Sequence, residues 1–327
     1  MTYFKGTILA IVCSVASLSS PTSMVAAFSM PMFTEQKTMQ RTTPSKTDGV
    51  EIEIPNFDEL FGRIKEVSPL AALAIDGKEG NFQVADELYP SSLKWKKVES
   101  NKRKTVHQIE KIDNFQGLGC PMVRFRASLK GPCIGMKFAS FIMDLEERKK
   151  WDPQIEQVDE IFPIYDVDAA NIAMDFQYGD CKRLGIGYCQ TKSNPVVDGR
   201  EQLILCGIQD MPNQSTVIWG TELEEWHNHL FPQDIPRRTR AKSHLFASTL
   251  VPTGPDSFDV EYILQLEVGG NIPAFLTTPV LVQTVKGMFN YAEKTFGDEE
   301  VMAPWVKQQE EIQDSMIAER QQLLMPL

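Results

Sequence analysis

The order of strand-like and helix-like segments is the feature of this chain that most restricts its fold. Short segments of partly alternating hydrophobicity come first, and one helical stripe follows them. Further strand-like segments succeed it, and a long helical stripe ends the series. Strands and helices grouped in this way, instead of alternating singly, are typical of the α+β class. We therefore predict an antiparallel sheet that curves around the final helix.

Eight segments carry the strand pattern. They are Trp95–Glu99, Val106–Ile112, Met122–Leu129, Ile172–Tyr178, Glu201–Gln209, Thr216–Glu224, Arg240–Leu250 and Phe258–Leu266. Apolar residues at helical spacing mark the other segments. The predicted helices are Phe57–Val67, capped by Asn56 and interrupted by Pro69, then Phe82–Leu88, Lys137–Lys150, a long helix from Pro273 to Phe296 that Gly297 can end, and a charged tail, Glu299–Leu324.

The N-terminus has the pattern of a targeting leader. Lys5 precedes the short apolar run Ile8–Leu18, and small residues at Val25–Ala27 suit a peptidase, which would leave Phe28 first. The next segment, up to Lys46, is basic and rich in Ser and Thr. Such a leader resembles the bipartite plastid-targeting leaders of diatoms and related algae. The alternative is an ordinary secreted or endomembrane protein with a disordered start.

Five regions follow from these patterns. They are residues 1–27, a signal peptide; 28–55, a transit-like segment and linker; 56–79, an N-terminal helical extension; 80–297, the main domain; and 298–327, a helical tail. The formal net charge of −11 argues against nucleic acid as the main partner. Five cysteines follow the leader without a Cys-x-x-Cys spacing, so buried free thiols are expected rather than a disulfide framework or a zinc finger.

Three motifs occur in a specific order. Arg148-x-x-Trp151-Asp152 follows the first inner helix, Asp198-Gly199-Arg200-Glu201 precedes a strand, and Gly269-Gly270-Asn271-Ile272-Pro273 opens the long helix. Over roughly Asn81 to Phe296 this order resembles the START lipid-binding family, although Val268 stands where that family has a proline. The resemblance implies a helix-grip fold with an internal hydrophobic cavity that holds one lipid. It also implies no cofactor, no catalysis, and transient contact with a membrane.

The resemblance nominates a set of lipid-binding residues. Arg148 and Asp152 are the positions that face the lipid phosphate in phosphatidylcholine-binding members, and guanidinium suits phosphate. The alternative is a structural ion pair at a helix end. A gapped alignment adds Met174, Gln202 and His244 near the choline positions. Only His244 is aromatic, so the ligand stays open among phospholipid, galactolipid, sterol and isoprenoid.

The resemblance nominates the final helix as a lid over the cavity. Its lid residues are Pro273, Leu281, Val285 and Met288. Two basic groups could meet anionic headgroups or could be solvated turns. The first is Lys94, Lys96, Lys97, Lys102, Arg103 and Lys104, and the second is Arg237, Arg238, Arg240 and Lys242. Arg124 and Arg126 share one face of a strand, and we expect that face to be solvent.

Two further function classes stay open. In a helix-grip enzyme acting on a hydrophobic substrate, the candidate acid or base groups are His244, Asp175, Glu201 and Tyr178. In an interaction module, the tail stripe Val301, Trp305, Ile312 and Met316 would dock a partner, although packing onto the domain is expected. His227 and His229 lack a distant ligand pair, so we expect a loop at the cavity mouth and no metal.

Overall fold

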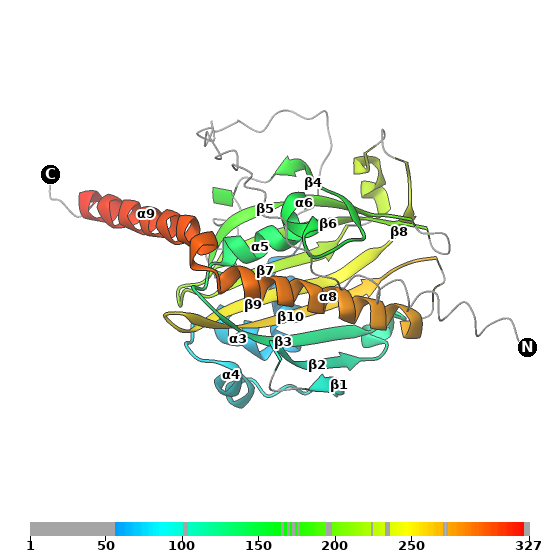
Figure 1. Cartoon of the computed structure of the whole chain (residues 1–327), viewed down its shortest axis with the longest axis horizontal. Coiled ribbons are helices and arrows are strands. Elements are labelled where there is room, and N and C mark those ends of the chain that lie inside the picture. Colours follow the sequence, from blue (N-terminus) through cyan, green and yellow to red (C-terminus); the bar gives the residue numbers. More distant parts are fainter. Residues whose placement is uncertain are drawn as a thin grey trace, which may run out of the picture. The chain divides into compact units, whose positions relative to one another are not determined.

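A computed structural model describes residues 56–100, 104–164, 167–168, 171, 174, 177–193, 198–223, 225–232, 236–270, 272 and 274–323. The predicted signal peptide and transit-like segment lie outside these residues. The described residues belong to one compact unit. A single large sheet dominates this unit, with helices on both of its faces (Figure 1).

Ten strands form the sheet. They are β1 (Lys96–Ser100), β2 (Val106–Ile112), β3 (Met122–Lys130), β4 (Ile155–Ile164), β5 (Asp180–Thr191), β6 (Arg200–Asp210), β7 (Thr216–Glu222), β8 (Thr239–Arg240), β9 (Lys242–Gly254) and β10 (Ser257–Glu267). The order across the sheet is β1-β2-β3-β10-β9-β7-β6-β5-β4, and every pair in it is antiparallel. The short strand β8 pairs with β6 in parallel. The last strand, β10, therefore joins the N-terminal strands to the rest.

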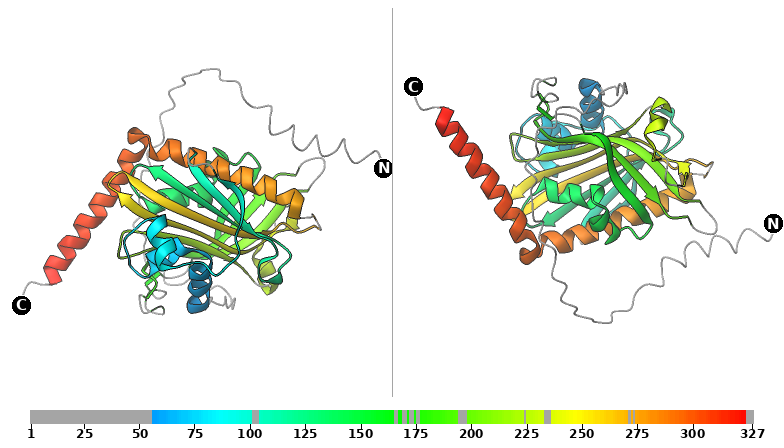
Figure 2. Two further views of the ribbon diagram at one scale, coloured as in Figure 1. Left: turned by 90° about the horizontal axis from the view of Figure 1, so that it is seen from below. Right: turned by 90° about the horizontal axis from the view of Figure 1, so that it is seen from above.

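Helices cover the sheet on both sides. They are α2 (Phe57–Val67), α3 (Pro69–Ile75), α4 (Phe82–Leu88), α5 (Gly135–Met143), α6 (Leu145–Lys149), α8 (Ala274–Phe296) and α9 (Glu299–Leu323), with the 3-10 turns η1 (Phe115–Gly117) and η2 (Glu225–Leu230). Figure 2 shows α8 and α5 on one face of the curved sheet and α2 and α3 on the other. This is the predicted α+β helix-grip architecture. Within the described part of the chain, no helix is long and apolar enough to cross a membrane.

Side-chain alternation divides the core into two clusters. Trp219, Leu245 and Ile263 face α2 and α3. Ile218 and Phe246, which are their neighbours along the strands, face α5 and α8 instead. The face beneath α8 is therefore separate from the face that carries the N-terminal helices.

The N-terminal helices are fixed to the sheet by a buried carboxylate. Asn56 caps α2 as predicted, with its Oδ1 accepting from the backbone N–H of Asp58 at 3.1 Å. Ser68 caps α3, and its hydroxyl also donates to Glu261 on β10. Glu261 is 1% exposed. The extension is therefore packed as part of the same core.

The two arginines of β3 are buried, so the expectation that they face solvent is wrong. Arg126 donates to Glu261 at 2.6 Å and forms a two-pronged pair with Asp86 at 2.7 Å. Arg124 pairs with Glu110, and its guanidinium stacks over the ring of Trp95 at 4.2 Å. Ion pairs and hydrogen bonds offset the desolvation free energy that an isolated buried charge would cost. These arginines join α4 to the outer face of the sheet.

Other departures from the predicted elements have local causes. The helix predicted at Lys137–Lys150 breaks at Asp144, which is extended and caps α6 by accepting from the Glu147 N–H at 2.9 Å. The described residues of the predicted strand Ile172–Tyr178 form turns. Strands β4 and β5 were not predicted. The glycine pair at the start of the long helix behaves as expected, since Gly269 and Gly270 have φ values of 66° and 70°.

Candidate functional site

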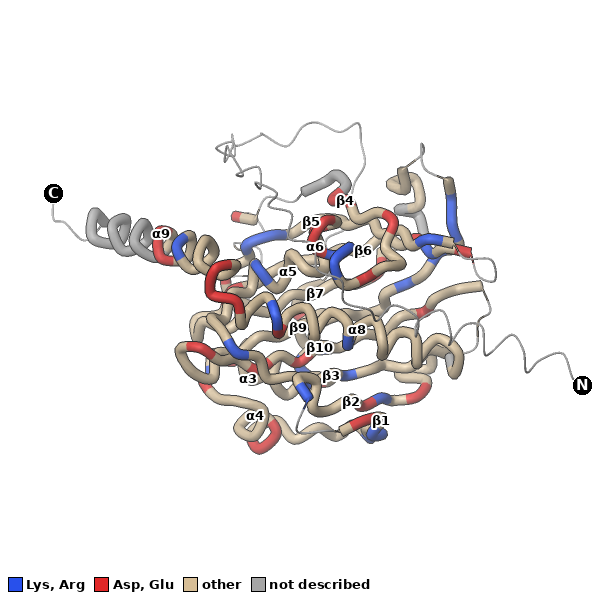
Figure 3. Tube along the Cα trace, in the orientation of Figure 1, with Lys and Arg blue, Asp and Glu red and all other residues tan. Residues whose placement is uncertain are grey.

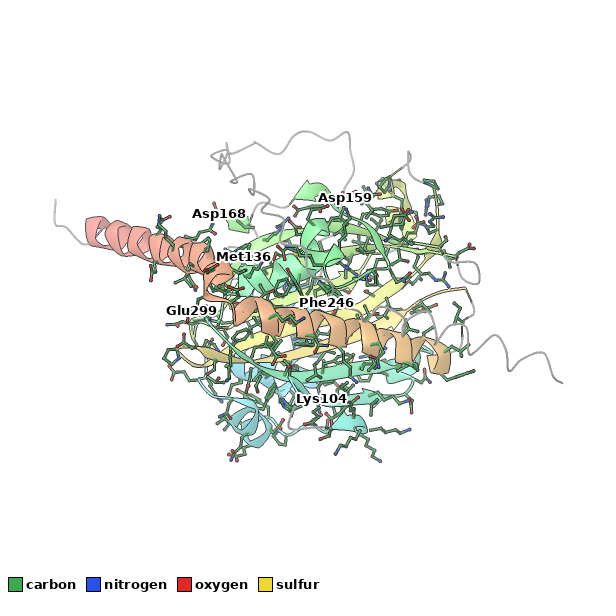
Figure 4. The ribbon with its side chains drawn as sticks, in the orientation of Figure 1. Lys104, Met136, Asp159, Asp168, Phe246 and Glu299 are labelled. Carbon is green, nitrogen blue, oxygen red and sulfur yellow. The ribbon has the colours of Figure 1, made fainter. Side chains whose placement is uncertain are left out.

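The candidate site is the apolar face of the sheet beneath α5 and α8. Its large buried residues come from the strands and from both helices. They include Phe125, Ile218, Phe246, Tyr262, Phe138, Phe141, Val285, Met288 and Phe289. Figure 4 labels Phe246 on this face, behind α8. A face of this composition suits the hydrocarbon part of an amphiphile.

Strand β6 has partly exposed side chains on this face. On β6, Leu203 and Leu205 point to the α2–α3 side and are 1% and 2% exposed. The alternate residues of β6 point to the α8 side and are only partly buried; they are Gln202, Ile204 and Cys206. Since β6 lies inside the sheet between β5 and β7, this exposure does not arise at a sheet edge. This part of the α8-side face is therefore less fully covered than its surroundings, and the partly exposed Arg183–Glu160 pair lies beside it.

Arg148 lies in the last turn of α6. Its Nε lies 3.4 Å from Asp152 Oδ2, and one terminal nitrogen donates to the Ile142 carbonyl at 3.3 Å. The Arg148 side chain is 17% exposed, whereas that of Asp152 is 5% exposed. Burial opposes the charge of Arg148, but Cys189 and Asp152 together raise its pKa. The result is a permanent cation with one buried partner and accessible surface left over.

Polar groups from four strands lie beside Arg148 or are linked to its neighbours: Cys189 and Tyr262 lie near it, Gln202 lies beside Cys189, and Ser243 bonds to Gln202. Cys189 on β5 is the register partner of Gln202 on β6, and the Gln202 side-chain oxygen accepts from the Ser243 hydroxyl at 3.0 Å. Burial raises the pKa of Tyr262 on β10 to about 12. The positive charge of nearby Arg148 acts in the opposite direction and lowers this pKa. The structure thus brings together Arg148, Asp152 and Gln202 of the nominated residues, and adds Cys189, Ser243 and Tyr262. Only the pairing of distant strands identifies these last three.

Two nominated ligand residues do not join this polar cluster. Met174 packs in the core on the α2–α3 side of the sheet, where its sulfur lies 4.0 Å from Gln209 Nε2. His244 follows Ser243, but its ring pairs with Glu222 on β7 and lies 3.4 Å from Glu267 Oε2. Hydrogen bonds to Cys120 and Glu222 raise the pKa of His244 to about 10. The charged imidazolium ties together the ends of β7 and β10.

The long helix is held in place along most of its length. Val285 and Met288, both nominated as lid residues, are 4% and 1% exposed, while Leu281 is partly buried. Pro273 lies outside the described residues. By contrast, Phe275 and Val280 in the first turns of α8 are 74% and 53% exposed. The beginning of α8 is therefore the part least anchored to the core.

The candidate acid and base groups have structural partners. Glu201 accepts from Arg237 at 2.6 Å, and the Tyr178 hydroxyl donates to Asp58 at 2.5 Å. Asp175 lies outside the described residues. No group of three or more His, Cys, Asp or Glu side chains within the described ranges could hold a metal. The five described cysteines are free thiols, as expected.

Comparisons with known proteins give likenesses in structure alone. No family model matches the chain, and no curated protein matches its sequence. Among solved structures, human STARD10 is 17% identical, with a TM-score of 0.46 and coverage of 70% of this chain and 86% of its own. Human StAR-related lipid transfer protein 5 is 13% identical, with a TM-score of 0.48 and coverage of 74% and 98%. With TM-scores below 0.5, these likenesses carry no argument about function.

Proposed function

We propose that this protein binds a single lipid between the sheet and α8 and carries or senses it at membranes without chemical turnover. The observation that carries the proposal is the apolar face beneath α5 and α8, where Gln202, Ile204 and Cys206 of β6 are only partly buried and a cluster of polar groups surrounds Arg148. The motif resemblance to START domains supports it. The ligand class remains the one expected from the sequence: a phospholipid, galactolipid, sterol or isoprenoid.

The physical basis is the burial of hydrocarbon. Each buried CH₂ group contributes about 0.8 kcal/mol before the cost of ordering the chain. A lipid that leaves a bilayer gives up a similar amount of favourable burial free energy, so the net free energy of transfer is close to zero. Transfer therefore requires contact with the membrane. The least anchored part of the structure beside the site is the beginning of α8, with Phe275 exposed. We propose that this part moves when lipid enters or leaves.

Mass spectrometry of the purified protein tests this function. The protein isolated from cells should carry lipid in native spectra and move labelled lipid between vesicles. Cys206→Phe should project a larger side chain into the proposed lipid site beside β6 and lower lipid content several-fold, whereas Cys206→Ser should not. An empty protein that also transfers no lipid would contradict the proposal. A bound ligand that is released in chemically altered form would favour an enzyme instead.

We also propose a plastid location. It rests on the leader pattern alone, in which Phe28 follows the small residues of a signal peptide. A fluorescent protein fused after residue 55 should accumulate in the plastid of an alga with a complex plastid. Secretion of that fusion, or its retention in the endomembrane lumen, would refute this location.

A further inference from the structure

The short helix that carries Arg148 has no buried residue of its own. This helix, α6, spans Leu145–Lys149, and none of its five residues is buried. Short helices are marginal in water, and in proteins the packing of an apolar face usually stabilises them. Because α6 lacks such a face, polar contacts must hold it on the domain. These contacts therefore decide where the Arg148 guanidinium lies.

Glu147 makes polar contacts of this kind with both of its carboxylate oxygens. Its Oε2 accepts a hydrogen bond from the Tyr291 hydroxyl of α8 at 2.8 Å. Its Oε1 accepts one from Lys150 at 2.9 Å and lies 3.4 Å from Lys137 Nζ of α5. One carboxylate thus joins α6 to α5 and α8, the two helices that cover the apolar face.

The charges at this junction depend on one another. Burial raises the pKa of the Glu147 carboxyl, but hydrogen bonds from Lys150 and Tyr291 and the charge of Lys137 outweigh burial, so the pKa is lowered. Burial lowers the pKa of Lys137, and the charge of Glu147 opposes that change. Loss of the carboxylate would leave a buried ammonium without its ion-pair partner, which is costly.

The tail helix α9 covers the Lys137 side of this junction. Lys137 is 3% exposed, and its Nζ lies 5.2 Å from the ring centroids of both Phe141 on α5 and Trp305 on α9. Such cation–π contacts stabilise an ammonium that is shielded from water. Figure 3 shows in red the acidic turn where α9 begins, and Met302 in the same part of α9 is buried. The first turns of the tail therefore belong to the support of α6.

Arg148 follows Glu147 directly but has different partners. Side chains at successive helix positions do not face each other. Glu147 contacts α5 and α8, whereas Arg148 contacts Asp152 at 3.4 Å and the Ile142 carbonyl at 3.3 Å. Since α6 has no buried side chain to keep it in place, a shift at Glu147 would carry the Arg148 guanidinium with it.

We propose that Glu147 is a positioning residue, which holds α6 against Lys137 and Tyr291 so that the Arg148 guanidinium meets the oxyanion of a bound lipid. Glu147 itself does not contact the lipid, because both of its oxygens are engaged by other side chains. The inference rests on the proposed function, since it makes the selectivity of Arg148 depend on a carboxylate that does not contact the ligand. It also gives the tail a part in ligand selection, through Trp305 and Lys137.

Lipid mass spectrometry of paired variants tests this role. Glu147→Gln keeps the shape of the side chain but removes its charge. It should lower the ratio of phosphate-bearing to neutral copurifying lipids roughly threefold at unchanged total lipid content, as expected for residues coupled in one network. Tyr291→Phe, which removes one hydroxyl from α8, should act in the same direction. Glu146→Gln is the matched control: that carboxylate is 79% exposed and pairs with Lys149, so the ratio should not change.

A double-mutant cycle shows whether Glu147 acts through Arg148. In a protein that already carries Arg148→Leu, adding Glu147→Gln should not change the ratio further. Unchanged selectivity in Glu147→Gln, an equal loss in Glu146→Gln, or a full additional loss in the double variant would overturn the inference.

Hydrogen–deuterium exchange in α6 separates this inference from the carrier function. Glu147→Gln should speed exchange in α6 and leave the strands of the sheet unchanged. Unchanged exchange in α6 refutes the anchoring by Glu147, whether or not lipid is bound. A wild type that is empty and transfers no lipid refutes the carrier function, and with it any role of Glu147 in ligand selection. A loaded Glu147→Gln protein with faster exchange and unaltered selectivity refutes only the positioning role.

Discussion

Accessibility separates the arginines that hold the fold from the one that suits a ligand. Arg126 is 4% exposed and shares three hydrogen bonds with Glu261 and Asp86. Arg148 has a longer contact to a single carboxylate, Asp152, and its side chain is 17% exposed. A cation that is paired but not fully enclosed can add an oxyanion without breaking its existing contacts. Arg148 is therefore the residue on which headgroup selectivity should depend.

Replacing Arg148 tests that selectivity. Arg148→Leu should lower the ratio of phosphate-bearing to neutral lipids that copurify by about tenfold, because a hydrogen bond to a charged group contributes about 1.5–3 kcal/mol. Lipid mass spectrometry measures the ratio. Lys149→Leu, which removes the neighbouring cation of α6 and its exposed pair with Glu146, should leave it unchanged. If Arg148→Leu retains all lipids equally, the Arg148–Asp152 pair is structural.

His244 predicts a pH dependence of stability. Its pKa in the folded protein is about 10, against 6.5 for the ordinary group. Its contribution is therefore complete below pH 6.5, and it is lost as pH rises through the folded value. Between these limits the wild type should lose on the order of 2–4 kcal/mol of unfolding free energy relative to His244→Gln. Urea unfolding at several pH values measures this loss. The prediction is wrong if the unfolding free energies of the two proteins change in parallel with pH.

At the scale of elements, two helix caps of similar chemistry differ in what else they bind. The Asn56 side chain caps α2 at an exposed position. The Ser68 hydroxyl caps α3 at 2.9 Å from the Ala71 N–H and also donates to buried Glu261. Glu261 in turn accepts from Arg126. The cap of α3 is thus part of the contact between helix and sheet.

Removing each cap should show this difference. Asn56→Ala should lower the unfolding free energy by about 1 kcal/mol, the usual effect of an N-cap. Ser68→Ala should cost about 2–3 kcal/mol, because it also removes a hydrogen bond to a buried carboxylate. Equal losses in denaturant unfolding would mean that the bond to Glu261 adds nothing.

Local patterns predicted some elements well and missed others for physical reasons. The bounds of β2 and α4 are as predicted, because alternation and capping are local signals. β4 interleaves acidic residues with its apolar ones, and β5 contains Gly185 and Gly187, so neither has a clear strand pattern. Glu261, the carboxylate that accepts a hydrogen bond from buried Arg126, lies 135 residues further along the chain. For the same reason the motif gave Arg148 and Asp152 and the gapped alignment gave Gln202, while Ser243 and Tyr262 required the sheet pairing.

For the molecule as a whole, ligand binding and folding should be coupled. A lipid between sheet and helix contacts only the folded state, so it adds about 2.7 kcal/mol when free ligand exceeds the dissociation constant a hundredfold. For a domain of this size, such a gain raises Tm by roughly 5–10 °C. Stripping lipid from the purified protein should lower Tm, and adding the copurifying lipid back should restore it. A Tm indifferent to both steps would argue against a lipid enclosed in the domain.

The anchoring of α3 on Glu261 has a practical consequence for anyone who shortens this chain. A recombinant fragment that starts near Asn81, where the resemblance to START domains begins, would lack Ser68 and would uncover the apolar side of Trp219 and Ile263. We expect it to aggregate. A fragment that begins at Asn56 keeps α2 and α3 and should stay folded.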